Sequence, residues 1–145
     1  DTGGYPSSCW KQINGAWYYF NNSGYILTGW QRLDGDWYYL NPSGAMTTGW
    51  QAINGQWYHM NSSGVMQTGW QAVNGRWYYM NSSGAMQTGW QRLNGQWDYL
   101  DPSGAMLTGW QAINGKWYYL GSNGVMYANT TTPDGRYVDG SGALQ

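Results

Sequence analysis

The amino-acid sequence predicts an all-β fold, a solenoid of stacked β-hairpins built from a 20-residue repeat. The first observation is the spacing of the twelve tryptophans, which fall on two phases twenty residues apart. One phase holds Trp10, Trp30, Trp50, Trp70, Trp90 and Trp110, and the other holds Trp17, Trp37, Trp57, Trp77, Trp97 and Trp117. Such fixed self-similarity is typical of a repeat architecture, in which each unit buries its apolar surface against its neighbours.

The second observation is a turn dipeptide between the two tryptophans of each repeat. It is Asp34-Gly35 in one copy and Asn-Gly in the others, at Asn14, Asn54, Asn74, Asn94 and Asn114. A type I′ turn needs positive φ at both central residues, and Asn-Gly and Asp-Gly supply it at low cost. We therefore expect a hairpin in every repeat, with Trp30 opposite Tyr39. Alternation along the strands then places Trp30, Trp37 and Tyr39 on one face, and Leu33, Tyr38 and Leu40 on the other.

A second turn follows each hairpin, as in Asn41-Pro42-Ser43-Gly44, and Ala45-Met46 then leads into the next Thr-Gly-Trp. Apolar residues at positions 53, 73, 93 and 113, and at 60, 80, 100 and 120, predict the core. Both ends of the array are atypical, as the terminal caps of repeat proteins usually are. We expect a degenerate lead-in over residues 1–9, six repeats over residues 10–129 and a degenerate capping repeat over residues 130–145.

Composition excludes several classes of partner. The chain has six Lys and Arg against seven Asp and no Glu, so it lacks the basic surface that nucleic-acid binding requires. No apolar run is long enough to span a membrane, and no signal peptide precedes the repeats, so we expect a mature product or an excised fragment. Cys9 is the single cysteine, which leaves either a half-buried or free thiol or a disulfide to another chain or to sequence outside this one.

Catalytic and metal-binding groups are scarce. With His59 as the single histidine and no glutamate, the sequence offers no convincing nucleophile–base pair and no His/Cys metal set. The aspartates at positions 34, 101 and 134 are explained by turns. We therefore expect a protein that is not an enzyme and needs neither a cofactor nor a metal.

The tryptophan face of each hairpin has two interpretations. Its rings could pack against the next hairpin, as aromatic side chains do in many cores. The Leu33 face already supplies a core, however, so the tryptophan face carries more aromatic surface than stacking requires. Exposed clusters of such rings bind sugars or quaternary ammonium cations, which lie over the ring faces.

The repeat resembles the choline-binding, or cell-wall-binding, repeat of pneumococcal-type autolysins, phage lysins and surface proteins. Segment 69–90 shows the motifs that carry this resemblance: Gly-Trp-Gln, Asn-Gly, Trp-Tyr-Tyr-Met-Asn, Ser-Gly and a closing Thr-Gly-Trp. The resemblance extends from about Trp10 to Met126. It implies a left-handed superhelix of hairpins, with choline sites between consecutive hairpins.

In that family each site takes two tryptophans from one repeat and the last tyrosine of Trp-Tyr-Tyr from the next. The implied cages are Trp10, Trp17 and Tyr39; Trp30, Trp37 and His59; Trp50, Trp57 and Tyr79; Trp70, Trp77 and Tyr99; and Trp90, Trp97 and Tyr119. A sixth would begin with Trp110 and Trp117, but its closing residue is missing or comes from another chain. The residues that could line the base are Ile26, Met46, Met66, Met86, Met106 and Met126.

Two residues depart from the pattern. His59 stands where a tyrosine is expected, which predicts a weaker and pH-sensitive second cage, because protonated imidazole repels a cation; a tolerated replacement without effect is the alternative. Asp98 replaces the first tyrosine of a Trp-Tyr-Tyr triplet. We expect it on the face away from the cages, beside a widened stack or at a solvent-facing edge, without a role in ligand binding.

Three functions remain open from the sequence. The resemblance implies binding to choline, or to the phosphocholine of teichoic acids, by an extracellular module at a bacterial or phage-targeted cell wall. Related aromatic repeats also serve in glucan binding. A self-assembling solenoid, joined into a homo-oligomer through its terminal repeats, is the third possibility.

Overall fold

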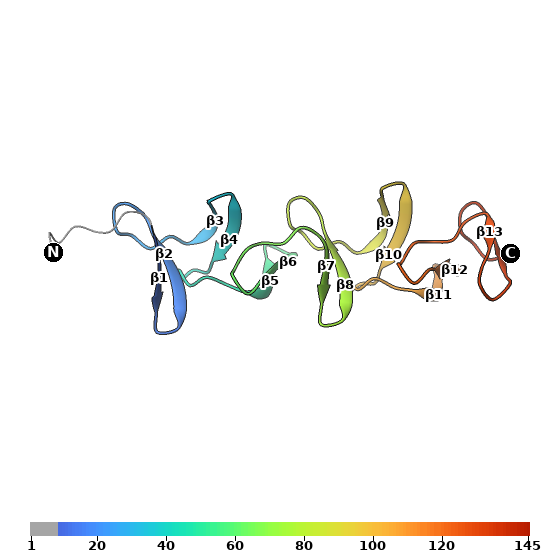
Figure 1. Ribbon diagram of the computed structural model, residues 1–145, viewed down its shortest axis with the longest axis horizontal. Coiled ribbons are helices and arrows are strands. Elements are labelled where there is room, and N and C mark those ends of the chain that lie inside the picture. Colours follow the sequence, from blue (N-terminus) through green and yellow to red (C-terminus); the bar gives the residue numbers. More distant parts are fainter. Residues whose placement is uncertain (1–8) are drawn as a thin grey trace. The chain divides into compact units, whose positions relative to one another are not determined.

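The computed structural model describes residues 9–145 and contains seven two-stranded antiparallel sheets in that range (Figure 1). The rest of the predicted lead-in, residues 1–8, lies outside the described residues. Six hairpins have five-residue strands: β1 (Cys9–Ile13) with β2 (Ala16–Phe20), β3 (Gly29–Leu33) with β4 (Asp36–Leu40), β5 (Gly49–Ile53) with β6 (Gln56–Met60), β7 (Gly69–Val73) with β8 (Arg76–Met80), β9 (Gly89–Leu93) with β10 (Gln96–Leu100), and β11 (Gly109–Ile113) with β12 (Lys116–Leu120). The seventh pairs the short β13 (Thr130–Thr131) with β14 (Tyr137–Val138).

The tight turn inside each hairpin has the predicted geometry. Asp34 has φ of 52° and Gly35 has φ of 85°, and the Asn-Gly turns of the other repeats show positive φ at both residues as well. The two-residue loop fixes the register, so Trp30 pairs with Tyr39 and Leu33 pairs with Asp36. The predicted hairpins, their pairing and the all-β class are confirmed.

The second turn is held by a side chain. The Oδ1 atom of Asn41 accepts hydrogen bonds from the backbone N–H groups of Ser43 and Ala45, both at 3.0 Å. This arrangement mimics a backbone turn, which is why Asn and Asp are favoured there. The chain then runs back beside β4, where Met46 bridges to Leu40. It leaves in the direction of the next hairpin.

The core lies along the ends of the second strands. One side chain from each of six hairpins has an exposed fraction of 0%: Leu40, Met60, Met80, Leu100, Leu120 and Val138. Ile53 and Ile113 are also buried, whereas Val73 and Leu93 are half-buried. The predicted core positions are therefore confirmed, with the strand ends buried most completely.

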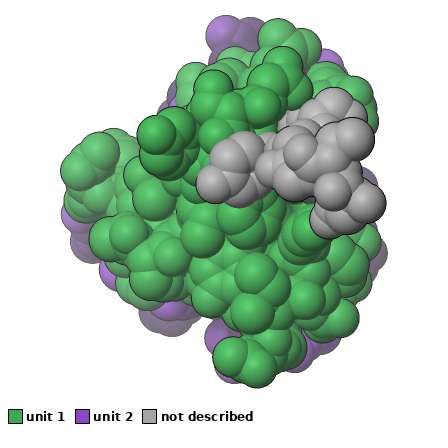
Figure 2. Space-filling model, turned by 90° about the vertical axis from the view of Figure 1, so that its left-hand side faces the viewer, with its two compact units in different colours: residues 1–68, 82–85 green, residues 69–81, 86–145 purple. Residues whose placement is uncertain are grey.

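The chain forms two compact units, shown in separate colours in Figure 2. Of the described residues, one unit comprises 9–68 and 82–85, and the other comprises 69–81 and 86–145. Within each unit, a backbone hydrogen bond joins one hairpin to the segment that follows the next hairpin. The Met66 N–H donates to the Trp37 carbonyl at 2.7 Å, and the Met126 N–H donates to the Trp97 carbonyl at 2.7 Å.

Glycine in the second turn permits close stacking. Gly64 has φ of 83°, and a Cβ atom there would lie 2.4 Å from the Met46 sulfur, which is far inside van der Waals contact. The same relation joins Gly124 to Met106 in the other unit. Among residues 9–145, no helix is long and apolar enough to cross a membrane.

Candidate functional site

The two tryptophans of a hairpin meet on one face. Trp30 on β3 and Trp37 on β4 have ring centroids 6.4 Å apart and planes at 83°, and Trp90 and Trp97 repeat this arrangement at 6.2 Å. The second tryptophan of each pair is the more open, with an exposed fraction between 39% at Trp97 and 50% at Trp117. An edge-on pair of this kind leaves one indole face free for a further contact.

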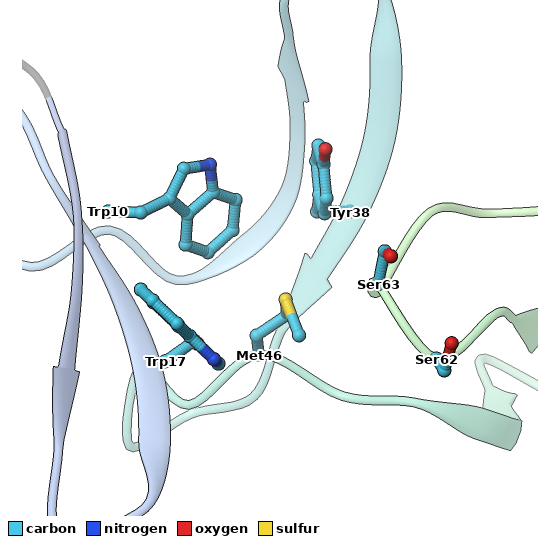
Figure 3. Close-up of a pocket in the computed structure, with 6 residues that line it drawn as sticks. All are labelled: Trp10, Trp17, Tyr38, Met46, Ser62 and Ser63. Carbon is cyan, nitrogen blue, oxygen red and sulfur yellow. The ribbon is translucent and has the colours of Figure 1, made fainter.

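The first cage joins this pair to the hairpin that follows. Trp10 and Trp17 line a cavity of about 420 Å³ together with Tyr38 from β4 and Met46 after it. Figure 3 shows the two indoles converging on Met46, with the Tyr38 ring facing them from the next hairpin. The Trp10 and Tyr38 ring centroids are 4.9 Å apart. Ser62 and Ser63, from the turn one repeat further on, complete the lining.

The second cage repeats the first by twenty residues. Trp30, Trp37, Tyr58 and Met66 line a cavity of about 430 Å³, with Ser82 and Ser83 at its far side. The Trp30 and Tyr58 centroids are 4.9 Å apart, and in the other unit Trp90 and Tyr118 are 5.1 Å apart. Each of these two cavities therefore draws its lining from three successive repeats.

In the Trp10 and Trp30 cavities the third ring is the first tyrosine of Trp-Tyr-Tyr, Tyr38 or Tyr58, whereas the resemblance implied the last. The predicted residues instead pack, edge-on or tilted, against the first tryptophan of their own hairpin, with ring centroids 4.8–5.2 Å apart: Tyr39, His59, Tyr79, Tyr99 and Tyr119. The reason is alternation. Tyr39 shares the face of Trp30, which is turned toward the following hairpin, so the side chain that faces back toward Trp10 must have the opposite parity. The two-face assignment contained this signal and could have identified Tyr38.

These aromatic pairs lie in a sequence whose family can be assigned. The model of the choline-binding repeat matches residues 7–48, 47–88 and 87–130. The chain belongs to the choline-binding repeat family. No curated protein is significantly similar to it.

Solved structures agree with the choline-binding repeat fold. Choline-binding protein F from Streptococcus pneumoniae, in the presence of a peptidoglycan analogue, superposes with a TM-score of 0.91 at 46% identity, over 94% of this chain and 46% of that one. CbpJ from S. pneumoniae TIGR4 gives a TM-score of 0.90 at 45% identity, over 94% and 47%. The multimodular pneumococcal cell-wall endolysin from phage Cp-1, complexed with choline, gives 0.60 at 32% identity, over 93% and 42%. These likenesses are consistent with the predicted superhelical solenoid.

His59 does not belong to the second cage of the choline-binding repeats. Its ring lies 4.8 Å from that of Trp50 in its own hairpin, and its Nδ1 atom is 2.6 Å from Oε1 of Gln67. The Trp30 and Trp37 cavity is closed by Tyr58 instead. The structure thus places the His59 ring beside Trp50 and outside the Trp30 cavity, and a role of His59 in ligand binding stays a prediction.

Asp98 lies in a cage, contrary to the prediction. It pairs with Gln91 across the hairpin, on the face opposite its own tryptophans as expected, but that face closes the preceding cage. Asp98 therefore lines a cavity of about 380 Å³ with Trp70, Trp77 and Met106. The side chain is 5% exposed, and burial raises the pKa of its carboxyl group to about 6.

The last tryptophan pair has no third ring. Trp110 and Trp117 line a smaller cavity, of about 230 Å³, with Asp134, Arg136 and Leu144. The Trp110 indole N–H donates to Oδ2 of Asp134 at 3.0 Å, and the Arg136 Nε atom lies 3.7 Å from the same oxygen. A cation of the protein itself therefore lines this cavity.

Three of the six residues predicted to line the base of a cage do line a cavity. Met46, Met66 and Met106 line the cavities of the Trp10, Trp30 and Trp70 pairs, respectively. Ile26 instead meets Gly44. Met126 follows the hairpin that contains Tyr118, and its backbone N–H donates a hydrogen bond to the Trp97 carbonyl. The cage expected of Trp50, Trp57 and Tyr79, with Met86 at its base, stays a prediction, as do all the assignments of ligand contacts.

Proposed function

We propose that this chain is a non-catalytic attachment module that binds choline, including the phosphocholine of teichoic acids, in aromatic cages between consecutive hairpins. The observation that carries the proposal is the cavity of Figure 3, in which two indoles and a phenol ring surround one space above the Met46 thioether. The match of the choline-binding repeat model to most of the chain supports the same ligand.

The chemistry of the cage suits a trimethylated ammonium group. A quaternary ammonium cation has no hydrogen-bond donor, so it is recognised by the negative faces of aromatic rings and by apolar contact with its methyl groups. Each favourable cation–π contact contributes roughly 0.5–2 kcal/mol. Two indoles and a phenol then account for a dissociation constant of about 1 mM, which corresponds to about −4 kcal/mol.

Repetition would convert weak sites into firm attachment. When a polymer carries many choline groups, each later cage binds at the effective concentration set by the first. A repeated surface polymer is therefore the natural partner of a repeated cage, and we place the module outside the cell, at a bacterial or phage-targeted wall. The Cp-1 endolysin, a cell-wall enzyme solved with choline, supports this setting.

The chain spans about half the length of the solved chains that it matches. The activity and further partners of the whole protein are therefore a separate question.

For the described residues we propose binding without catalysis, since the aromatic cavities offer π faces and thioethers where an enzyme would need a nucleophile and a base. We also propose that the Trp110 and Trp117 cavity does not take choline, because the paired side chains of Asp134 and Arg136 stand where the other cages have an aromatic ring, so the cavity lacks the third π face.

Titration of tryptophan fluorescence with choline tests the proposal, with a dextran oligomer and sodium chloride as controls. We expect a saturable change with choline alone, and elution of the protein from a quaternary-amine resin by free choline. A response to dextran without a response to choline would replace the proposal with glucan binding. Concentration-dependent oligomers without a response to either ligand would favour a self-assembling solenoid.

A further inference from the structure

The cage of Trp70 and Trp77 contains a carboxylate in place of a phenol ring. In the Trp10 and Trp30 cages the residue that faces back from the next hairpin is Tyr38 or Tyr58. In the Trp70 cage the same position of the repeat is Asp98. The two indoles and the thioether of Met106 are kept, so this site differs from the others in one wall.

Asp98 lines the cavity without a hydrogen-bonding partner, and its carboxylate oxygens keep access to the cavity, because no side-chain oxygen or nitrogen of the described residues is both fully buried and unpaired. Its side chain is 5% exposed, and within residues 9–145 it makes no hydrogen bond or ion pair. The nearest candidate donor by register, the Gln91 amide, donates to the Thr88 carbonyl at 2.9 Å instead. Burial alone raises the carboxyl pKa, so no protein cation compensates the charge. An unpaired buried carboxylate is costly, and a bound cation would remove that cost.

The surroundings leave the carboxylate open to the cavity. Asp98 Oδ1 lies against the α-carbon of Gly124, where a Cβ atom would be 2.8 Å away. Apart from Asp98, the cavity is lined by apolar residues such as Trp70, Trp77 and Met106 and by uncharged polar ones such as Ser122 and Asn123, so no other lining residue carries a charge at neutral pH. Arg76 on β8 and Arg92 on β9, the cationic side chains of the adjoining strands, do not line it, and Asp101 is bonded to Ser103.

We propose that the Trp70, Trp77 and Asp98 cage selects ammonium ions that carry at least one N–H group, whereas the tyrosine cages select fully methylated ones. This inference rests on the proposed function, because it takes the aromatic cages to be cation sites. An N–H group can donate a charge-assisted hydrogen bond to Asp98, which a quaternary ammonium ion cannot do. The missing phenol ring also removes one π face from the contact with a trimethylated head group.

Binding of the protonated forms of N,N-dimethylethanolamine and ethanolamine, compared with choline, tests the inference by calorimetry at pH 7.5. The wild-type chain should show one site at which dimethylethanolammonium binds roughly tenfold more tightly than choline, the gain expected of a hydrogen bond to a charged group. Asp98→Tyr rebuilds the wall of the other cages and should abolish that site. Tyr58→Asp is the matched variant, and it should create a second such site with Trp30 and Trp37.

A proton count provides a second readout. At pH 6 a cation in the Asp98 cage should displace a proton from that carboxyl group, so the observed enthalpy should vary with the ionisation enthalpy of the buffer. Asp98→Asn, which keeps the shape of the side chain, should remove this dependence. Circular dichroism of each variant shows whether the repeats remain folded.

The inference is overturned if the three ligands rank in the same order in the wild type, Asp98→Tyr and Tyr58→Asp while choline still binds. That result leaves the proposed function standing. If choline binds nowhere but dimethylethanolammonium binds in an Asp98-dependent manner, the proposed function fails together with the selectivity inferred for the tyrosine cages, and only the assignment of the Asp98 cage to N–H-bearing ammonium ions holds.

Discussion

At the scale of the residue, the parity of a side chain along its strand decides which cage it serves. Tyr58 closes the cage of Trp30 and Trp37, and its neighbour His59 contacts Trp50 in its own hairpin. Tyr58→Ala should therefore weaken choline binding at the Trp30 cage by the loss of one ring contact, roughly 0.5–2 kcal/mol. Site-resolved NMR of the indole N–H signals measures this loss.

His59→Ala is the matched control for Tyr58→Ala. Because the His59 ring lies outside the Trp30 cavity, choline affinity there should not change, and its pH dependence should match that of the wild type. A loss on His59→Ala equal to that on Tyr58→Ala would contradict the placement of both side chains.

Asp98 should impose a pH dependence on stability. Burial raises its pKa in the folded protein from an ordinary value of 3.8 to about 6. The folded state then holds a proton that the unfolded state releases, so stability should fall as pH rises from about 4 to about 6 and level off above that. Relative to Asp98→Asn, the wild type should lose about 1–2 kcal/mol across this range, less than the full pKa difference implies, because water in the open cavity screens the carboxyl group. Urea unfolding of both proteins without ligand measures the difference, and parallel pH profiles would contradict it.

The sequence predicted these residues unevenly. Tryptophan spacing located both indoles of each cage because the repeat itself marks them. The third wall depends on which face of a hairpin is turned toward the preceding hairpin. Side chains alternate between the two faces, so Tyr38 lines the preceding cavity while Tyr39 contacts Trp30 in its own hairpin, and the resemblance alone does not make this distinction. Without this distinction Asp98 was placed away from the cages, although its parity with Tyr38 and Tyr58 was visible in the sequence.

At the scale of the element, the two turns of a repeat serve different purposes. The Asn54-Gly55 turn needs positive φ at both residues, but a Cβ atom on Gly55 would meet nothing within 4 Å. At Gly64, by contrast, the Cβ atom would lie 2.4 Å from the Met46 sulfur. One turn therefore sets the hairpin register, and the other sets the spacing between hairpins.

This difference predicts unequal effects of two alanine substitutions. Gly55→Ala should cost about 1–2 kcal/mol, because the left-handed conformation is unfavourable for an L-residue. Gly64→Ala should cost more, since it adds a clash with Met46, and it should also weaken choline binding in the Trp10 cage that Met46 lines. Thermal unfolding with and without choline compares the two variants. Equal losses of stability, with choline affinity intact in both, would contradict the stacking described above.

Hairpins and turns were the most predictable part of the fold. Asn-Gly dipeptides and alternating side chains depend on local geometry, which the sequence expresses directly. Contacts between repeats depend on stacking distance, which the repeat period does not determine. The contribution of Ser62 and Ser63 to a cage two repeats earlier was accordingly not foreseen.

At the scale of the whole molecule, the described cages should act together on a polymer. Loss of one cage, as in Trp37→Ala, should reduce the affinity for free choline only at that site. Attachment to a surface dense in choline should weaken by a much larger factor with each further cage removed. Once one cage is occupied, the next cage binds its choline group at the high effective concentration that the tether creates. Surface plasmon resonance on a choline-bearing polymer, compared with free-choline titration, measures both effects. Proportional losses in the two experiments would contradict multivalent attachment.

The central claim is that a trimethylated ammonium group occupies the space between successive hairpins. A crystal structure of the chain saturated with choline tests it most directly. We predict density for the head group within about 6 Å of the ring centroids of Trp10, Trp17 and Tyr38, above the Met46 thioether. Empty cages at saturating choline, or choline bound against Tyr39 on the far side of the hairpin, would contradict the account.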